Sequence, residues 1–383
     1  MSSARPDQNR HVLLENPRRP SPDPAHPGIR PAAGAADGTP TPRRRTAPAR
    51  GRRLGRLAAL SGAALLLAAC AAHPASVLHP QGAAARMEYR LFDFSLIIMT
   101  GVFLSVIIPL TYVILRYRQR SAAQPLPKQV EGSHFLEMLW TVVPIVLLIA
   151  LAVPTVGDAF RLAAPAGPEA LQVTVIGHQW WWEFRYPSLG IVTADEMHIP
   201  AGQRVELTLE SADVLHSFWV PSLAGKEDTV PGQPNSMWLE ADHPGTYPGQ
   251  CAEFCGLSHS LMRFFVVAQT PSGFAAWVHG MQHPVTTPQT PLAAQGLSIF
   301  NQYGCGGCHT IDGTAAQGTV GPNLTGLGNR AVVVAGALQN NAADLSQWIH
   351  DPNAIIPGTV MPAFQGLSPT QMQALTAYLE GLK

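Results

Sequence analysis

Two long uncharged apolar segments restrict the folds open to this chain of 383 residues. The first runs from Phe94 to Leu115, 22 residues, and the second from Met138 to Gly157, 20 residues. A helix needs about 20 residues to cross the hydrocarbon core of a bilayer, so each segment is long enough to span a membrane. The alternative is a buried helical hairpin in a soluble domain. We expect a transmembrane helical hairpin over residues 86–160, with spans at about 94–116 and 138–157.

Basic side chains between the two apolar segments predict the orientation of the hairpin. The connecting loop contains four of them: Arg116, Arg118, Arg120 and Lys128. Because short loops rich in Lys and Arg stay on the cytoplasmic side, we expect this loop inside and everything after Asp158 outside. Glu137 then lies at the cytoplasmic mouth of the second span. There it is either solvated by lipid headgroups or part of a functional site.

The N-terminal region has the composition of a leader rather than of a folded domain. Residues 1–50 are rich in Pro, Arg and Ala without apolar periodicity, which predicts a disordered basic tail or a segment upstream of the true start codon. The apolar run 57–69 follows a basic stretch, as in a signal peptide, so residues 1–69 are read as tail plus signal. The run ends in LAAC, which resembles a lipoprotein lipobox and would make Cys70 the acylated residue. Ordinary cleavage after an alanine is the alternative.

Residues 171–270 have the sequence pattern of a β-sandwich. In QRVELTLESAD, Val205, Leu207 and Leu209 alternate with polar residues, so one face of this strand is apolar and the other is wet. Pro and Gly turns separate it from further β-branched and aromatic segments. This stretch carries eleven acids against four bases, whereas residues 1–56 carry twelve Arg against four acids. The zero net charge therefore conceals an acidic domain, which suits docking of a cationic partner.

The motif GQCAEFCGLSHSLM contains four potential metal ligands: Cys251, Cys255, His259 and Met262. Zinc accepts Cys and His, but Met is a poor zinc ligand. A disulfide between the two Cys gives no reason for His259 and Met262. Thiolate, imidazole and thioether are all copper ligands, and two thiolates can bridge two copper ions. Such a pair needs one terminal His for each copper. His216 in DVLHSFWV is the candidate for the second, although taken alone it would be a core histidine.

Three stretches, VLHSFWVPSL, PGQCAEFCGLSHSLM and GHQWWWEF, resemble the binuclear-copper (CuA) domain of cytochrome c oxidase subunit II. The resemblance includes the hairpin and covers about residues 86–270. It implies a cupredoxin-like fold and six copper ligands: His216, Cys251, Glu253 through its backbone carbonyl, Cys255, His259 and Met262. It also implies that the Glu253 side chain helps hold a magnesium ion at the junction with subunit I. Trp180 matches the residue that receives the electron, and Glu137 matches the acid at the entrance of the proton path.

The C-terminal part follows a Pro- and Thr-rich segment, residues 280–291, which is expected to be a linker. Residues 292–383 contain Cys305-Gly-Gly-Cys308-His309, the C-x-x-C-H signature of c-type haem attachment. The two Cys form thioethers with the haem, and His309 becomes an iron ligand. A redox-active C-x-x-C pair is the alternative, but the adjacent His argues against it.

The second iron ligand must come from the opposite side of the haem. Met361 in PGTVMPAF resembles the Met-Pro loop of class I cytochromes c. Met372 competes, but Ser368 and Gln371 predict a helix start that places Met372 on the apolar face of a helix. Pro322 lies in a stretch, GPNL, that resembles the family loop whose proline carbonyl holds the haem-ligating His ring. The C-terminal part therefore resembles a complete all-α class I cytochrome c.

These resemblances together imply subunit II of a bacterial caa-type oxidase with a fused cytochrome c. Electrons would pass from an external donor, a soluble cytochrome c or a quinol–cytochrome c reductase, to the haem, then to the copper pair and to subunit I, which reduces oxygen to water. The expected location is the bacterial inner membrane, among other oxidase subunits, with the copper and haem domains outside and no nucleic-acid partner. The alternatives are the electron-input subunit of a copper-containing nitric oxide reductase and a free-standing membrane-tethered carrier. A carrier would need only one anchor, which argues against it.

Overall fold

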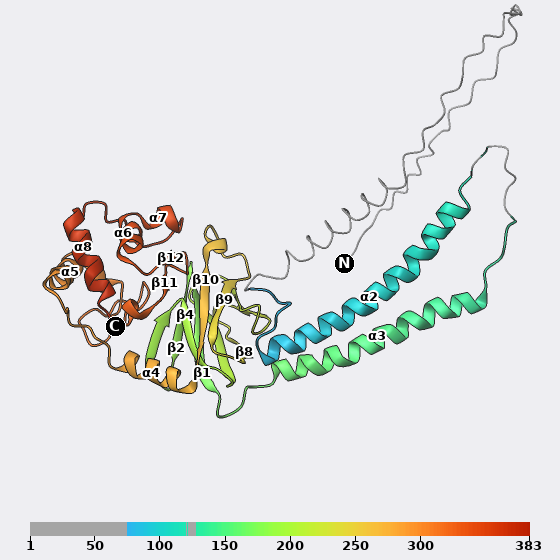
Figure 1. Cartoon of the computed structure of the whole chain (residues 1–383), viewed down its shortest axis with the longest axis horizontal. Helices are drawn as coiled ribbons and strands as arrows, with labels where there is room; N and C mark the ends of the chain where they lie inside the picture. The colour runs from blue at the N-terminus through green and yellow to red at the C-terminus, as the bar shows by residue number, and fades with distance from the viewer. Residues whose placement is uncertain (1–74, 120, 122–127) are drawn as a thin grey trace, which may run out of the picture. The chain divides into compact units, whose positions relative to one another are not determined.

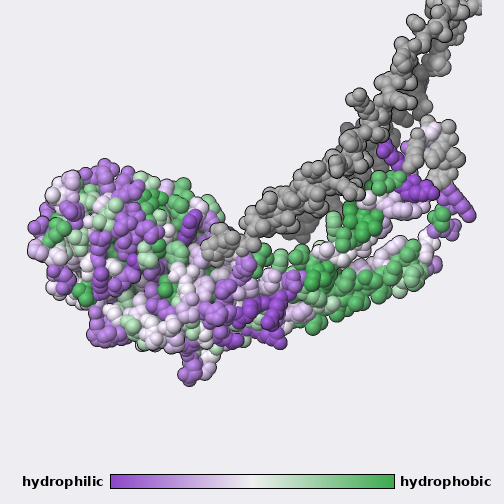
Figure 2. Space-filling model, viewed as in Figure 1, coloured by the Kyte–Doolittle hydropathy of each residue, from purple (hydrophilic) through white to green (hydrophobic). Residues whose placement is uncertain are grey.

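The computed structural model describes residues 75–119, 121 and 128–383, so the expectations for the tail, the signal segment and Cys70 lie outside the described residues. Two long helices come first, α2 (Ala83–Arg116) and α3 (His134–Ala163). They lie side by side (Figure 1). Each contains an apolar window that is 0% buried and is long enough to cross a membrane. Apolar side chains cover much of the surface of both helices (Figure 2), as a lipid-facing hairpin requires.

Helix α2 begins well before the predicted span because its first turns pack on the following domain rather than in lipid. Ala84 and Ala85 are buried, and the Ala85 N–H donates to the Leu223 carbonyl at 3.1 Å. Arg86 forms an ion pair with Asp242. Hydropathy detects only the apolar part of such a helix, so it placed the start of the span later in the chain.

Residues 171–269 form two five-stranded sheets that pack as a sandwich (Figure 1). The first sheet has the order β3 (Ile191–Ala194), β2 (Trp181–Tyr186), β1 (Leu171–His178), β5 (Val205–Ser211), β8 (Asn235–Leu239). The second has the order β4 (Glu196–Pro200), β10 (Arg263–Gln269), β9 (Gly245–Cys251), β6 (His216–Trp219), β7 (Lys226–Thr229). Neighbouring strands are antiparallel except for the parallel pairs β1–β5 and β4–β10.

The sandwich core consists of the inward faces of both sheets. The alternating residues of β5 behave as expected, since Val205, Leu207 and Leu209 are fully buried. An aromatic cluster fills the centre, with the rings of Phe218 and Phe264 stacked at 4.6 Å. This core fixes the ends of β6 and β9, from which the candidate metal ligands project.

Helix α4 (Pro271–Gln282) follows the sandwich, and the sequence analysis did not predict it. Its last residues fall within 280–291, which was expected to be linker. Thr270 caps it, because the threonine side chain accepts the Gly273 N–H and a proline occupies the first turn. The segment opens with Pro and Ser, which are typical of a turn. It therefore lacks the long apolar periodicity that predicts a helix.

The C-terminal domain is helical and contains α5 (Pro291–Gln302), α6 (Ala342–His350), α7 (Pro352–Ile355) and α8 (Pro369–Glu380), and α5, α6 and α8 supply side chains to its core. A two-residue ladder joins β11 (Val332–Val333) to β12 (Leu338–Gln339). The predicted helix start at Ser368 is confirmed, because Ser368 and Gln371 form a reciprocal capping box. Helices α5 and α8 pack against each other and enclose the core side chains Phe300 and Tyr378.

Replacing Phe218 by Ala should destabilise the sandwich. The side chain is 0% exposed and contacts three other aromatic rings, so its loss leaves a cavity that costs about 3–5 kcal/mol. Chemical unfolding of the full chain in detergent, followed by tryptophan fluorescence, measures this loss. The matched control Phe274→Ala removes a ring that lies on α4 outside the core, and it should cost much less. Equal losses for the two variants would contradict the assigned core.

Candidate functional site

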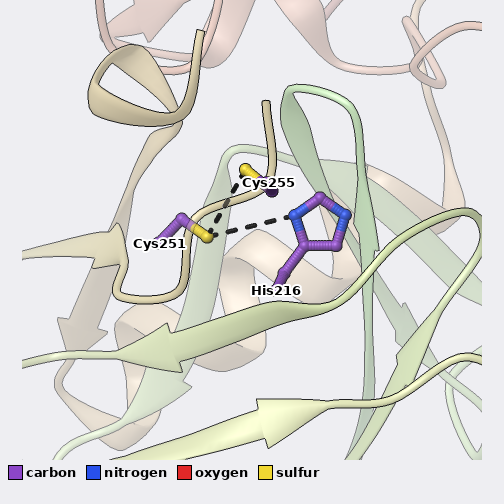
Figure 3. A group of neighbouring side chains, drawn as sticks. All are labelled: His216, Cys251 and Cys255. Carbon is purple, nitrogen blue, oxygen red and sulfur yellow. Dashed lines mark hydrogen bonds between the residues drawn. The ribbon is translucent and has the colours of Figure 1, made fainter. Parts of the chain in front are cut away.

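Three side chains from separate segments converge at one end of the sandwich (Figure 3). His216 begins β6, Cys251 ends β9, and Cys255 lies in the loop that follows. Cys251 Sγ lies 3.8 Å from Cys255 Sγ and 3.9 Å from His216 Nδ1. All three residues are buried, so their ligand atoms face one another away from solvent.

The rest of the motif completes a shell around the two sulfur atoms. His259 Nδ1 lies 3.6 Å from Cys255 Sγ, and Met262 Sδ lies 3.7 Å from the same sulfur. The carbonyl oxygen of Glu253 lies 3.2 Å from Cys251 Sγ. The structure thus brings together the six residues that the sequence analysis nominated. Each cysteine sulfur has one histidine nitrogen near it: His216 Nδ1 beside Cys251 and His259 Nδ1 beside Cys255.

These spacings fit metal coordination. Bonds of about 2.0–2.3 Å in a tetrahedral site put neighbouring donor atoms about 3.3–3.8 Å apart, and the donors here lie 3.6–3.9 Å apart. Thiolate, thioether and imidazole together form a soft donor set, which favours copper over a harder cation. Two cysteine sulfurs with one histidine nitrogen near each fit a pair of copper ions better than a single ion.

The contact between the two sulfurs affects the acidity of both thiols. The hydrogen bond from one sulfur to the other lowers the pKa of Cys251 and raises the pKa of Cys255. Thiolate is the form that binds metal, and the lowered pKa of Cys251 favours it. Burial alone would lower the pKa of His216, but its hydrogen bonds to Asp213 and Cys251 outweigh burial and raise it.

Asp213 orients His216, and the sequence analysis missed it. Asp213 Oδ1 lies 2.8 Å from His216 Nε2, on the side of the ring opposite Cys251. The carboxylate also accepts the backbone N–H groups of Gln179 and Val214, each at 2.6 Å. Such a carboxylate behind a metal-binding imidazole fixes the ring and its tautomer. The available signal was Asp three residues before His in DVLH.

Trp180 lies directly behind the cysteine loop. Its indole Nε1 donates to the carbonyl oxygen of Cys255 at 3.1 Å, and the Gln179 side-chain amide donates to the same oxygen at 2.7 Å. The Trp180 side chain is 8% exposed. Two donors on one carbonyl hold the backbone of Cys255 in place and so fix the position of its sulfur.

The C-x-x-C-H motif lines a cavity of about 380 Å³. Cys305, Cys308, His309 and Met361 all contribute to its wall, whereas Met372 is half-buried against the core of the C-terminal domain and does not line the cavity. The lining is mostly apolar, which suits a large aromatic ring system. Residues of the sandwich complete one side of this cavity: Gln179, Trp180, Trp181, Ala194 and Asp195.

The loop around Pro322 holds the His309 ring. His309 Nδ1 lies 2.8 Å from the Pro322 carbonyl oxygen, which leaves Nε2 free to face the cavity. Burial lowers the pKa of His309, so the ring is held in the neutral form that ligates iron. Gly321 passes so close to the ring that a side chain would meet His309 Cε1 at 2.6 Å, which explains the glycine.

The other nominated residues do not join this site. Glu137 lies in the first turn of α3, where its carboxylate pairs with His134 at 3.2 Å. The Glu253 side chain is half-buried beside the cysteine loop. Cys70 lies outside the described residues.

Three protein-family models match successive parts of the chain. Residues 72–157 match the transmembrane domain of cytochrome c oxidase subunit II, residues 189–269 match its periplasmic domain, and residues 293–383 match cytochrome c. The chain is 43% identical over 313 residues to cytochrome c oxidase subunit 2 of Alkalihalophilus pseudofirmus, covering 80% of this chain and 91% of that protein. It is 42% identical over 341 residues to the same subunit of Bacillus sp. strain PS3, covering 84% of this chain and 95% of that protein.

A solved structure is also similar to part of the chain. The periplasmic domain of cytochrome oxidase subunit II of Bradyrhizobium japonicum is 28% identical, with a TM-score of 0.29, and the match covers 30% of this chain and 96% of that one.

Asp213→Ala should weaken copper binding about 10–100-fold, because His216 loses the carboxylate that orients it. Competition with a copper chelator measures the affinity. The control Asp228→Ala removes a carboxylate from β7 of the same domain and should leave the affinity unchanged. Unchanged affinity in Asp213→Ala would show that the carboxylate has no role in holding the histidine.

Proposed function

The chain belongs to the cytochrome c oxidase subunit 2 family, and from this membership and the site geometry we propose how it carries electrons. It is the electron-input subunit of a terminal respiratory oxidase, in which a c-type haem and a copper centre pass electrons on for the reduction of oxygen to water. The oxygen-reducing site lies in subunit I, a separate chain.

One observation carries the proposed route: a single indole joins the two sites. Trp180 lines the haem cavity on one side, and on the other its Nε1–H donates to the Cys255 carbonyl at 3.1 Å. Trp180 would thus link the cavity that would hold the haem to a copper-ligand residue through one hydrogen bond. This contact supports Trp180 as the residue that receives the electron.

In this proposal six residues hold a binuclear copper centre: His216, Cys251, Glu253 through its carbonyl, Cys255, His259 and Met262. Bound there, the copper pair would supply a delocalised one-electron couple. Because the cysteines are buried, they would exclude water from the centre, and His216 and His259 would each offer one imidazole nitrogen to it. Asp213 and Trp180 keep the donors at fixed positions, so little of the surrounding protein has to move when the charge changes.

Four residues would hold the haem. Cys305 and Cys308 form the thioethers, His309 and Met361 ligate the iron, and the Pro322 carbonyl fixes the His309 ring. Their shared cavity supports this assignment, and so does the match of residues 293–383 to cytochrome c.

The membrane part of the proposal concerns the partner subunits. We place the two helices in the bacterial inner membrane, with the connecting loop inside and the copper and haem domains outside. Glu137 then forms the entrance of the proton path into subunit I, and the Glu253 side chain helps bind magnesium at the contact with subunit I. Cys70 is proposed as the acylated residue. The external donor is a soluble cytochrome c or a quinol–cytochrome c reductase.

Trp180→Phe tests the route directly in the purified oxidase complex. Phe keeps an aromatic ring but removes the N–H that reaches the Cys255 carbonyl, so transfer from haem to copper should slow about tenfold. Flash photolysis resolves the step. The control Trp238→Phe changes a tryptophan of β8 that faces Arg204, and its transfer rate should equal that of the unaltered protein. A normal rate in Trp180→Phe would reject the indole as the connection.

Met361→Ala should alter the haem spectrum and lower the haem reduction potential, because a Met ligand raises the potential. Met372→Ala should leave both unchanged, since that side chain does not line the haem cavity. Optical redox titration of the two variants measures both properties, and the near-infrared copper band should stay normal in each. The reverse pattern, with Met372→Ala altering the haem, would exchange the two assignments.

A further inference from the structure

Two adjacent carboxylates of the sandwich reach across to the C-terminal domain. Asp195 and Glu196 stand where the chain passes from β3 in one sheet to β4 in the other. Asp195 Oδ2 accepts the N–H of Ala335 at 2.9 Å. Glu196 Oε1 accepts the N–H groups of Ala331 at 3.0 Å and Val332 at 3.3 Å. Three backbone donors of one haem-domain loop are therefore satisfied by two side chains of the sandwich.

Both carboxylate oxygens and both backbone polar groups of Asp195 form hydrogen bonds. Its second carboxylate oxygen accepts the Trp182 N–H at 3.0 Å, so one side chain joins the sandwich core to the haem domain. Its own N–H donates to the Trp182 carbonyl, and its carbonyl accepts from Phe265. The residue adopts a left-handed backbone with φ of 59°, which is uncommon for a residue with a side chain.

The haem-domain loop is shaped to meet these carboxylates. Val334, Ala335 and Gly336 are successive left-handed residues with φ of 57°, 53° and 74°. A left-handed β-branched valine is an outlier that persists only when its surroundings determine it. Unusual backbone conformations thus stand on both sides of the same hydrogen bond, between Asp195 and Ala335. Two turns with uncommon backbone conformations joined by a hydrogen bond indicate a specific contact between the two domains.

A positive charge accompanies the two carboxylates. Arg330 is partly buried, and its Nη2 donates to the Asn323 carbonyl at 2.6 Å. Burial raises the pKa of Asp195 to about 6, against its hydrogen bonds and the charge of Arg330. Burial would also raise the pKa of Glu196, but the hydrogen bond of His198 and the charge of Arg330 lower it. The guanidinium offsets the cost of burying these acids between two domains.

A second set of contacts joins the Met361 loop to the copper loop. Ser258, next to the nominated ligand His259, donates to the Pro357 carbonyl at 2.8 Å. Gly358, with φ of 86°, passes so close to Trp180 that a side chain would meet its Cη2 atom at 2.7 Å. Ile356 is buried within the core cluster of the sandwich. The loop that carries Met361 thus rests on the indole proposed to receive the electron.

We propose that Asp195 and Glu196 are positioning residues that dock the haem domain onto the sandwich through the backbone of residues 331–335. This dock keeps the haem cavity closed by Trp180, so that the internal transfer starts from a fixed geometry rather than from diffusion of a tethered domain. The inference rests on the proposed function, because the value of the dock lies in the haem-to-copper step. Neither residue touches a nominated copper or iron ligand in the contacts described.

Hydrogen exchange on the intact oxidase tests the dock. In the unaltered protein, the amides of Ala331, Val332 and Ala335 should be protected although they belong to a loop. Glu196→Ala should lower the protection of the first two about tenfold, since a charged acceptor is lost. Glu196→Gln keeps an oxygen acceptor and should retain most of it. Glu210→Ala, at the end of β5 in the same domain, should change nothing.

Transfer kinetics separate positioning from a merely structural role. Glu196→Ala should slow haem-to-copper transfer while both optical spectra stay normal, and Glu196→Gln should restore the rate. Absence of the copper or haem bands in the unaltered protein would instead overturn the proposed function. Normal bands together with freely exchanging amides at 331–335, or with an unchanged transfer rate in Glu196→Ala, would overturn the dock and leave the function intact.

Discussion

The carbonyl oxygen of Cys255 is the acceptor on which the arrangement of this protein depends. It receives hydrogen bonds from the Trp180 indole and the Gln179 amide, while the sulfur of the same residue stands 3.8 Å from Cys251 Sγ. The same backbone group thus fixes the donor geometry of the copper site and its contact with the haem cavity. The sandwich supports this arrangement, because His216 at the start of β6 and Cys251 at the end of β9 lie at the same site.

Holding ionisable side chains in fixed, buried positions costs free energy, and neighbouring groups of opposite charge offset this cost. Asp213 stands behind His216, and Arg330 stands near Asp195 and Glu196. Arg330 and Lys383 are the only bases of residues 292–383, against four acids. Since the charge of Arg330 acts on Asp195 and Glu196 of the sandwich, the remaining charged side chains of the haem domain are mainly acidic, which favours a basic external donor.

The sequence predicts the candidate copper ligands and the haem-attachment residues because residue type and short spacing reveal their chemistry. Examples are Cys251 with Cys255, and Cys305 with Cys308 and His309. Sequence reasoning reached the sandwich and the membrane helices because hydrophobic period and length are local signals. It could not reach the early start of α2, which depends on packing against Leu223 and Asp242. Nor could it reach the contacts of Asp195 and Glu196, whose partners lie 140 and 135 residues away and are backbone N–H groups with no sequence signature.

The most direct test of the central claim is the order of reduction in the purified oxidase. A pulse of electrons from a photoactivated basic donor should reduce the haem first, and the near-infrared copper band should then change at the rate at which the haem is reoxidised. That result would establish the haem as the donor to the copper pair across Trp180. Copper reduction that precedes the haem signal, or that continues at full rate when the haem is kept reduced by a bound ligand, would contradict the account.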